Sequence, residues 1–505
     1  MFHLDPKEAV LEHVAHPPKA KAGPPRLGDL AAAIADQPIE PTYSAAVVTG
    51  VTQVAEIGVL TLTGFTLFGL NGGDTLLSVI TTLGVVAVAQ LFISLARMHS
   101  VAAYRLGFTQ IWKTALAWTA AFAVLGALVL LYDSGHALSR NWVVTFWAAG
   151  LVVLVVSRTF VHELVTRWTR QGKLRRRTVI VGGGKDAEAL IESIQTGASD
   201  DIDLLGLFDD RNDDRSPESV ASLAKLGRVA ELIEFARQTR VDLVIVSMPL
   251  FAEHRVLDML KQLWVLPVDI RLSAHMSKLR FTSKAYSYVG GVPVFDMADR
   301  PISDWNLVFK WLFDKLVAIT ALILLSPVMI ATAIAIKLES KGPVFFRQKR
   351  HGFNNQLIDM WKFRSMRTDM LDANATKLVT KDDPRVTKVG KFIRKTSIDE
   401  LPQLFNVLLG ELSIVGPRPH ALSAKADNQL YYDAVEGYFA RHRVKPGMTG
   451  WAQIHGWRGE TDTVDKIMQR VNHDLYYIEN WSLWLDVKIV AMTPISLFTQ
   501  RKNAF

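Results

Sequence analysis

Two adjacent carboxylates and an arginine between two prolines are the residues of this chain whose types and spacing suggest chemistry. Asp399 and Glu400 lie in "TSIDELPQLFNVLLGELSIVGPRP", which runs from Thr396 to Pro419. Ser397, three residues before Glu400, predicts a capping box at a helix start. Neighbouring residues on a helix point about 100° apart, so the two acids are unsuited to clamping one atom symmetrically. We expect separate tasks: one carboxylate attacks a substrate or binds a metal, and the other orients a group or takes a proton.

Cationic side chains gather in the motifs around these acids. A helix start favours negative charge and welcomes phosphate, and arginine forks match phosphate oxygens. The cations are Arg347, Arg350, Lys362, Arg364, Arg394 and Arg418, the last of which is held between Pro417 and Pro419. The combination predicts phosphoryl transfer through a carboxylate nucleophile. On its own, the Ser-x-x-Glu pattern is also that of an ordinary helix start.

The composition points to a membrane. The chain has 505 residues, enough for two or three domains, with 49% hydrophobic and 21% charged residues and a mean hydropathy of +0.17. It contains no cysteine, which excludes disulfides and cysteine-based zinc sites. A net charge of +8 suits nucleic acid or an anionic membrane surface. The hydropathy favours the membrane, so we expect a lipid bilayer as partner and no nucleic acid.

Four apolar runs within residues 41–165 predict a four-helix transmembrane bundle. They cover Ala45–Leu70, Leu76–Ala96, Trp112–Tyr132 and Trp142–Val161, each close to the length that crosses about 30 Å of hydrocarbon. Positive charge is concentrated after the second and fourth runs, which places both ends of the bundle in the cytoplasm. The alternative is a set of buried helices in a soluble domain. Residues 1–40 show no sustained period and predict a mobile N-terminal arm.

Glu56 stands in the middle of the first apolar run. A carboxylate inside a membrane segment is a functional candidate by default. The alternative, which we favour, is a hydrogen-bonded packing contact with Gln90, which the topology places at a similar depth.

Residues 175–300 predict a Rossmann-like α/β domain with a mostly parallel sheet. "RRRTVIVGGGKDAEALIESI" is typical of a strand, a glycine turn and a helix. Gly182, Gly184 and Ala187 fit the form of a dinucleotide-binding turn, and Asp209 or Asp210 follows the second strand where a ribose would lie. An unidentified nucleotide is therefore a candidate ligand. A Rossmann-like fold without a ligand is the alternative.

Residues 316–336 are long enough to cross a membrane, yet lysines and arginines flank both ends. Both flanks therefore favour the cytoplasmic face. Ser326-Pro327 lies at the centre; the proline disrupts the helix against the carbonyl of Ile323, and the serine hydroxyl can satisfy a freed carbonyl. We expect a re-entrant helix, the alternative being a fifth, kinked span. The last apolar segment, Glu479–Phe498, is too short to cross and predicts an interfacial helix.

The motifs resemble those of the bacterial polyprenol-phosphate phosphoglycosyl transferases of the monotopic type. The resemblance rests on "SIDELPQLFNVLLGELSIVGPRP", "GPVFFRQKRHGFNNQLIDMWKFRSM" and "KPGMTGWAQIHGWRGETDT". It covers residues 305–505 as an α-rich catalytic domain, and four spans plus a Rossmann-like domain resemble the large members. The fold class implied is a membrane protein that is α plus α/β.

This resemblance implies an activity and a set of residues. A UDP-sugar donates its sugar-1-phosphate to undecaprenyl phosphate with Mg²⁺, UMP leaves, and a covalent phosphosugar-aspartyl enzyme forms. Asp399 would be the nucleophile and a candidate ligand of Mg²⁺, and Glu400 the essential second acid. The implied basic positions are Arg350, Lys362, Arg394 and Arg418, and a later family aspartate corresponds to Asp474. Arg364, Pro417 and Pro419 lie in the same motifs and join the phosphate-binding set.

The resemblance also implies a setting. It places the protein in the bacterial inner membrane as a multi-pass protein, with the catalytic domain and both termini cytoplasmic, and makes a homodimer plausible. "GWRGETDT" (Gly456–Thr463) is similar to members that transfer glucose-1-phosphate to start an exopolysaccharide, with galactose-1-phosphate as the alternative. A nicotinamide-dependent nucleotide-sugar oxidoreductase and a non-catalytic scaffold are the remaining hypotheses. The oxidoreductase would want a Tyr-x-x-x-Lys pair after the sheet, but Tyr286 is followed at that spacing by Gly290.

Overall fold

The computed structural model divides the chain into two compact units. One comprises Ile39–Arg175, and the other comprises Met1–Pro38 together with Arg176–Phe505. The structure describes residues 26–38, 41–71, 75–131, 139–196, 201–211, 219–248, 253–273, 286–289, 292–367, 385–420, 425–426, 429–431, 435, 438–457 and 463–499.

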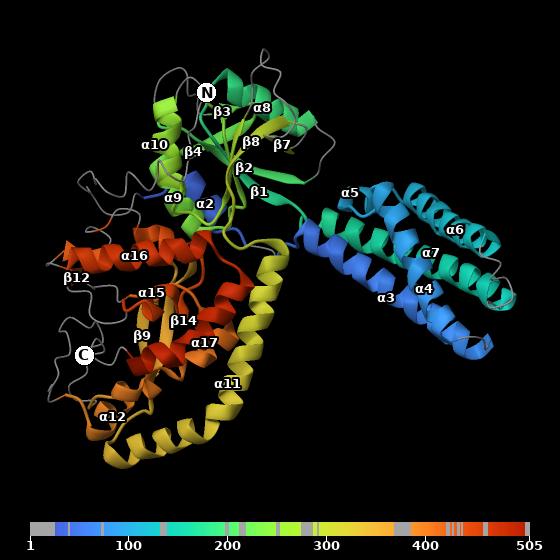
Figure 1. Ribbon diagram of the computed structural model, residues 1–505. Coiled ribbons are helices and arrows are strands. Elements are labelled where there is room, and N and C mark those ends of the chain that lie inside the picture. The colour runs from blue at the N-terminus through green and yellow to red at the C-terminus, as the bar shows by residue number, and fades with distance from the viewer. Residues whose placement is uncertain are drawn as a thin grey trace. The chain divides into compact units, whose positions relative to one another are not determined.

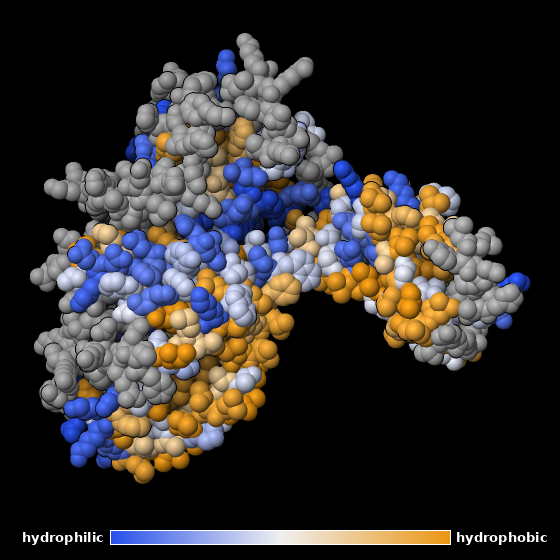
Figure 2. Space-filling view, in the orientation of Figure 1, coloured by the Kyte–Doolittle hydropathy of each residue, from blue (hydrophilic) through white to orange (hydrophobic). Residues whose placement is uncertain are grey.

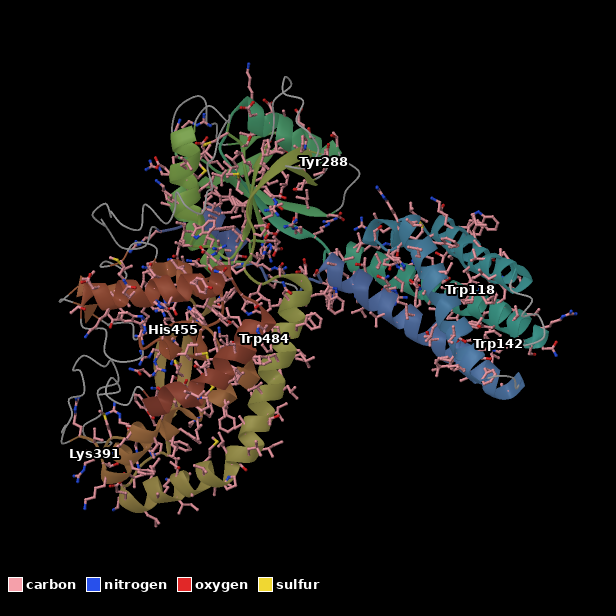
Figure 3. The ribbon with its side chains drawn as sticks, viewed as in Figure 1. Trp118, Trp142, Tyr288, Lys391, His455 and Trp484 are labelled. Carbon is pink, nitrogen blue, oxygen red and sulfur yellow. The ribbon has the colours of Figure 1, made fainter. Side chains whose placement is uncertain are left out.

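The first unit is a bundle of apolar helices (Figure 1). Its elements are α3 (Ala45–Asn71), α4 (Thr75–Leu95), the short α5 (Val101–Arg105), α6 (Phe108–Leu131) and α7 (Arg140–Arg170). The four long helices are each apolar and long enough to cross a membrane. Trp118 and Trp142 are buried at the centre of the bundle (Figure 3), where both rings contact Phe146. The four predicted apolar runs are therefore confirmed as helices.

Glu56 has a further partner besides the one that the sequence suggested. The Arg158 guanidinium lies 2.7 Å from one carboxylate oxygen of Glu56 and donates to the other at 2.8 Å. Arg158 also donates to the carbonyl of Met98 at 2.9 Å. Gln90 is buried and interacts with Glu56, as expected, but Arg158 is a partner that the sequence did not suggest. A buried carboxylate is stabilised far more by a buried cation than by a neutral amide. Glu56 thus belongs to an ion pair that joins α3 to α7.

The Rossmann-like domain is a mixed sheet between two layers of helices. Its strands are β1 (Arg176–Val181), β2 (Ile202–Phe208), β3 (Ser219–Val220), β4 (Leu223–Gly227), β5 (Leu243–Val246), β6 (Asp269–Ser273), β7 (Tyr286–Val289) and β8 (Val292–Ala298). The order is β3-β4-β2-β1-β5-β6-β8-β7, in which β4, β2, β1, β5 and β6 run parallel. This is the doubly wound order with antiparallel edges, so the predicted α/β domain is confirmed.

The period of two along each strand divides the core of this domain between the two faces of the sheet. Val179 and Val181 pack with α9 (Val229–Gln238) and α10 (Glu253–Leu263). Ile180 packs on the opposite side with α8 (Lys185–Thr196). The alternating valine and isoleucine pattern of β1 therefore encodes a strand that is buried on both faces.

The segment expected to be a mobile N-terminal arm contains a docked helix. Helix α2 (Asp29–Ala35) buries Ala31 and Ala35 completely or nearly so in the core that α9 also lines. The expectation is wrong for these residues, because small alanines allow a short helix to approach a neighbouring core closely. Residues 1–25 lie outside the described residues.

The catalytic domain is built from short elements on a long helix. They are α11 (Asp304–Glu339), β9 (Phe345–His351), η1 (Phe353–Asn355), β10 (Leu357–Phe363), α12 (Lys388–Thr396), η3 (Ile398–Glu400), α13 (Gln403–Leu409), β11 (Ser413–Val415), β12 (Lys425–Ala426), β13 (Gln429–Leu430), η4 (Tyr438–Arg443), β14 (Gly447–Thr449), α15 (Trp451–Ile454), α16 (Val464–Glu479) and α17 (Leu483–Thr499). Strands β9 and β10 form an antiparallel hairpin, and β11 pairs in parallel with β14.

Helix α11 has 36 residues with Pro327 inside it, and it changes direction along its length (Figure 1). Proline removes the amide that would bind the carbonyl of Ile323. The Ser326 hydroxyl donates to that carbonyl at 2.9 Å, which confirms the compensation that the sequence suggested.

The outer face of α11 is apolar and exposed (Figure 2). Leu316, Ile323 and Leu324 are each more than 60% exposed, which is unusual for a water-facing surface and is typical of lipid contact. Trp484, at the start of α17, is 75% exposed (Figure 3). Its position fits the interfacial segment expected near the end of the chain.

Candidate active site

Glu400 is held by two cations at the centre of the catalytic domain. Lys362 Nζ donates to its Oε1 at 3.0 Å. Arg418 donates to Oε1 at 2.6 Å and to Oε2 at 3.2 Å, so its fork binds both oxygens. Burial raises the pKa of Glu400, but the charges and hydrogen bonds of Arg418 and Lys362 outweigh burial and hold that pKa well below 4.5. Glu400 is therefore ionised and fixed in place.

Asp399 differs from Glu400 in its hydrogen-bond partners and in its pKa. It is 9% exposed, and within the described residues its carboxylate accepts no hydrogen bond. Burial raises the pKa of Asp399 to about 6; the charge of Lys362 opposes this rise and the charge of Glu400 adds to it. Asp399 thus carries a carboxylate that is desolvated, unclamped and still largely ionised at neutral pH. Those are the properties of a nucleophile.

The local backbone separates the two acids. Ser397 has φ +60° and ends α12, after which residues 398–400 form one turn of 3₁₀ helix. The expected capping box is wrong: the side chain of Ser397 caps no helix, and Glu400 turns to Lys362 and Arg418. Two charged donors bind a carboxylate more strongly than one backbone amide does. The predicted division of tasks between the two acids agrees with their different surroundings.

Arg350 and Lys362 come from the hairpin. Arg350 pairs with Ile358 across the strands, and Lys362 lies four residues beyond Ile358, so both side chains project from one face of the hairpin. Burial and the charge of Arg418 lower the pKa of Arg350 to about 10, against an opposing contribution from Glu400. This places Arg350 beside the pair formed by Arg418 and Glu400.

The loop that carries Arg418 is fixed through its backbone. The amide of Gly416 donates to Thr449 O at 2.9 Å, and that of Gly447 donates to Pro417 O at 3.0 Å. A Cβ atom on Gly416 would lie 2.4 Å from the carbonyl oxygen of Lys445, so only glycine allows this close approach. Pro417 and Pro419 are both buried. The arginine is therefore presented from a rigid support.

Asp474 is connected to this loop through Arg441. Its Oδ2 accepts from Arg441 Nη2 at 2.5 Å, and the same nitrogen of Arg441 donates to the carbonyl of Arg418 at 2.7 Å. Burial raises the pKa of Asp474, against the charges of Arg441 and Arg470. The structure thus places Asp474 where it positions Arg418 through Arg441.

The two remaining predicted cations, Arg394 and Arg364, lie in different places. Arg394 of α12 lies near enough to Asp399 for its charge to lower the pKa of that carboxyl. Arg364 is elsewhere: it donates to the carbonyls of Lys341 at 2.7 Å and Ser340 at 2.8 Å, at the end of α11. There it satisfies the unpaired carbonyls that every helix end exposes.

The sequence interpretation missed three residues of this cluster: Arg441, Arg470 and His420. Burial, followed by the charges of Arg441, Arg470 and Arg350, holds the pKa of His420 well below 6.5, so the imidazole is neutral. Arg470 precedes Asp474 by four residues on α16, and this helical spacing was the available signal.

The whole cluster carries excess positive charge. Its cations are Arg350, Lys362, Arg394, Arg418, Arg441 and Arg470, and its carboxylates are Asp399, Glu400 and Asp474. With all of them ionised, positive charges exceed negative charges by three. Such a site suits a substrate with one or two phosphate groups.

The Rossmann-like domain touches two elements of this site. Asn354, at the tip of the hairpin, donates to the carbonyl of Ala236 in α9 at 2.7 Å. The guanidinium of Arg237 lies 5.2 Å from the ring centre of Phe439 in η4, the element that also carries Arg441. The α/β domain therefore supports the segments that present the site's cations.

Comparison with known proteins places the chain in a family. Residues 305–500 match the model of the bacterial sugar transferase family, and residues 98–274 match a model described as a CoA-binding domain. The chain is 37% identical to a UDP-glucose:undecaprenyl-phosphate glucose-1-phosphate transferase of Klebsiella pneumoniae, over 76% of this chain and 81% of that protein. The chain belongs to the bacterial sugar transferase family.

Two further members of the family differ in coverage and sugar. The chain is 40% identical to an undecaprenyl-phosphate glucose phosphotransferase of Komagataeibacter xylinus, over 70% of this chain and 65% of that protein. It is 45% identical to a UDP-N-acetylgalactosamine-undecaprenyl-phosphate N-acetylgalactosaminephosphotransferase of Aeromonas hydrophila, over 37% of this chain and 43% of that protein. Relatives that match only about a third of this chain therefore include one named for a different sugar.

The glycine turn of the Rossmann-like domain binds a carboxylate of the protein itself, that of Asp209. The amide of Gly183 donates to Asp209 Oδ2 at 2.7 Å, and Arg211 joins that carboxylate at 2.8 Å while donating to Gly183 O at 2.7 Å. Gly182 and Gly184 have positive φ values that only glycine adopts readily. Asp209 therefore occupies the amide of Gly183, and a phosphate at this turn would bind instead at the start of α8.

Proposed function

We propose that this bacterial sugar transferase moves glucose-1-phosphate from UDP-glucose to undecaprenyl phosphate, releases UMP and thereby starts synthesis of an exopolysaccharide. The relatives' names support the substrates. The observation that carries the proposal is the unequal pair: Asp399 is unclamped and Glu400 is fixed by Lys362 and Arg418.

The chemistry uses two substitutions at one phosphorus atom. A carboxylate oxygen of Asp399 forms a bond to the phosphorus that bears the sugar, and the bond from that phosphorus to the oxygen of UMP breaks. UMP leaves with the bonding electron pair. A phosphate oxygen of the lipid then attacks the same phosphorus, and the bond to Asp399 breaks, which restores the carboxylate.

The residues around Asp399 lower the cost of both steps. Phosphoryl transfer depends chiefly on positioning and on neutralising phosphate charge. Glu400 orients Lys362 and Arg418 toward the reacting group, and the burial of Asp399 removes water that would hydrolyse an acyl phosphate. Because donor and lipid phosphate repel each other, a covalent intermediate allows each anion to use the cations in turn.

Mg²⁺ fits this site through its donors. In the described part of the chain, no three acidic or histidine side chains form a metal cluster. Mg²⁺ commonly binds one or two carboxylates together with substrate phosphates, and Asp399 offers one carboxylate beside the diphosphate. When bound, the ion would neutralise phosphate charge.

A re-entrant course of α11 is supported by its packing. Before Pro327, Lys310 pairs with Asp486 of α17 at 2.7 Å. After Pro327, Ile336 is buried with Ile393 of α12, and Glu339 accepts from the amide of Lys388 at 2.7 Å. Both halves of the helix therefore contact one catalytic domain. A helix that crossed the bilayer would carry one half away from that domain.

The proposed location is the bacterial inner membrane, with the catalytic domain in the cytoplasm. The amide of Tyr43, just before α3, donates to the carbonyl of Lys173, just after α7, at 2.8 Å. The two ends of the bundle therefore lie together, as four crossings require. The basic links favour the cytoplasm for that side, where UDP-sugars are made.

One assay tests the proposal. Detergent-solubilised full-length protein is given undecaprenyl phosphate with UDP-glucose, UDP-galactose or UDP-N-acetylgalactosamine, and UMP release is measured. We expect the wild-type protein to release UMP from UDP-glucose as the phosphosugar passes to Asp399 and then to the lipid. We expect no UMP release from Asp399→Asn. Faster release from UDP-galactose would transfer the proposal to the galactose alternative. No UMP from any donor would refute it.

A further inference from the structure

Arg470 is a buried cation, and two of its three guanidinium nitrogens have no acceptor within the described residues. It is 3% exposed, and neither Nε nor Nη2 has a hydrogen-bond partner within the described residues. Burying charged N–H groups without partners is strongly unfavourable. An arginine kept in this state is explained most directly by a ligand that supplies acceptor oxygens.

The third guanidinium nitrogen of Arg470, Nη1, contacts only His420 within the described residues. It lies 3.2 Å from His420 Nε2, while Arg441 Nη1 lies 2.6 Å from His420 Nδ1. A neutral imidazole accepts at only one ring nitrogen. Arg441 Nη1 also lies 3.3 Å from Nε2, and Tyr438 Oη lies 2.8 Å from Nδ1. Arg470 therefore shares one neutral imidazole with two other polar groups. Within the described residues, Nη1 of Arg470 therefore meets only a ring nitrogen, and Nε and Nη2 meet no acceptor.

Arg470 also lies on a particular side of the site. Its charge interacts with those of Arg418, Asp474 and Arg441. His420 and Arg441 join it to the carbonyl of Arg418. The charges that act on Asp399 come instead from Lys362, Glu400, Arg394 and Arg418. Arg418 is therefore the cation whose charge acts on both Asp399 and Arg470.

We propose that Arg470 binds the phosphate of the departing UMP; this rests on the proposed function. In phosphoryl transfer the attacking and leaving oxygens lie roughly in line. We place the leaving phosphate at Arg470, which His420 and Arg441 join to the carbonyl of Arg418. The guanidinium fork then receives the negative charge that builds on the leaving oxygen as its bond to the sugar-bearing phosphorus breaks.

The test compares stability with UMP binding. Arg470→Met and Arg470→Lys are made in the full-length protein, with Lys466→Gln, an exposed change on the same helix, as control. Thermal unfolding without ligand and UMP affinity by calorimetry are measured, together with inhibition of wild-type turnover by UMP. We expect Arg470→Met to unfold at or above the wild-type temperature, because it removes a buried guanidinium whose Nε and Nη2 lack acceptors within the described residues. UMP should bind about 10- to 100-fold more weakly.

The outcomes separate this inference from the proposed function. Arg470→Lys keeps the charge without the fork and should bind UMP with intermediate affinity. A variant that is folded and binds UMP like wild type overturns the role of Arg470, even if wild type releases UMP from UDP-glucose. A variant that is less stable without ligand shows that Arg470 supports the fold and also overturns it. If wild type releases no UMP, the proposed function fails first.

Discussion

Replacing Asp399 with asparagine should abolish turnover and stabilise the protein. The pKa of Asp399 is raised from 3.8 to about 6, chiefly by burial. Folding therefore favours the protonated form, and the stability that this group contributes is present below pH 3.8 and lost as the pH rises through about 6. At neutral pH the buried negative charge costs about 3 kcal/mol. Asparagine has nearly the same shape and carries no such charge.

The size of this stabilisation is measured by thermal unfolding of wild type and Asp399→Asn over the same range of pH. For a catalytic domain of this size, about 3 kcal/mol corresponds to a melting temperature about 6–12 °C higher for the variant at neutral pH. The advantage should narrow to about 1 kcal/mol near pH 4.5, where wild-type Asp399 is mostly protonated. Residues that titrate equally in both proteins cancel in this comparison.

Glu400→Gln is the matched control, because it should lower the stability of the protein at neutral pH, where Asp399→Asn should raise it. The pKa of Glu400 is held well below 4.5, so its contribution to stability is present above 4.5 and lost as the pH falls. Glutamine leaves Lys362 and Arg418 without their carboxylate, and the variant should be less stable than wild type at neutral pH. Equal melting temperatures for wild type and Asp399→Asn, or a difference that does not change with pH, would refute the account of Asp399 as a desolvated carboxylate.

Three further predictions test the site and its support. The kcat/KM for UMP release should fall about tenfold per pH unit below about 6, because protonated Asp399 cannot attack; a flat profile from pH 5 to 7 would contradict this. A protein containing only residues 305–505 should keep reduced activity with a raised KM for UDP-glucose, since it loses the contacts of α9, and Arg237→Ala in the full chain should shift KM in the same direction; wild-type kinetics in both would exclude this support. Single cysteines at Trp305 and Lys341 should react with an impermeant maleimide only in inverted vesicles, and labelling at Lys341 from the periplasm would show that α11 crosses.

The sequence predicts most clearly those features whose pattern is local. The four apolar runs, the alternating strands and the hydroxyl of Ser326 beside Pro327 depend on residues close together in the chain, and the structure contains all of them. The adjacency of Asp399 and Glu400 is also local, although their different partners are not.

Features that depend on distant partners were missed or misassigned. Arg364 follows Lys362 by two residues in a cationic motif, yet only the fold shows that it binds the end of α11. Arg158 pairs with Glu56 across 102 positions, and Arg470 meets His420 across 50. Burial decides each of these roles, and burial is a property of the assembled core rather than of the motif.

The most direct test of the central claim is to capture the phosphosugar on Asp399. Purified protein is incubated with UDP-glucose without lipid, quenched, digested and examined by mass spectrometry. The account predicts that the peptide carrying Asp399 gains one hexose phosphate, that Asp399→Asn does not, and that undecaprenyl phosphate removes the adduct as the glycolipid forms. UMP release that requires both substrates together, with no adduct on Asp399, would contradict it.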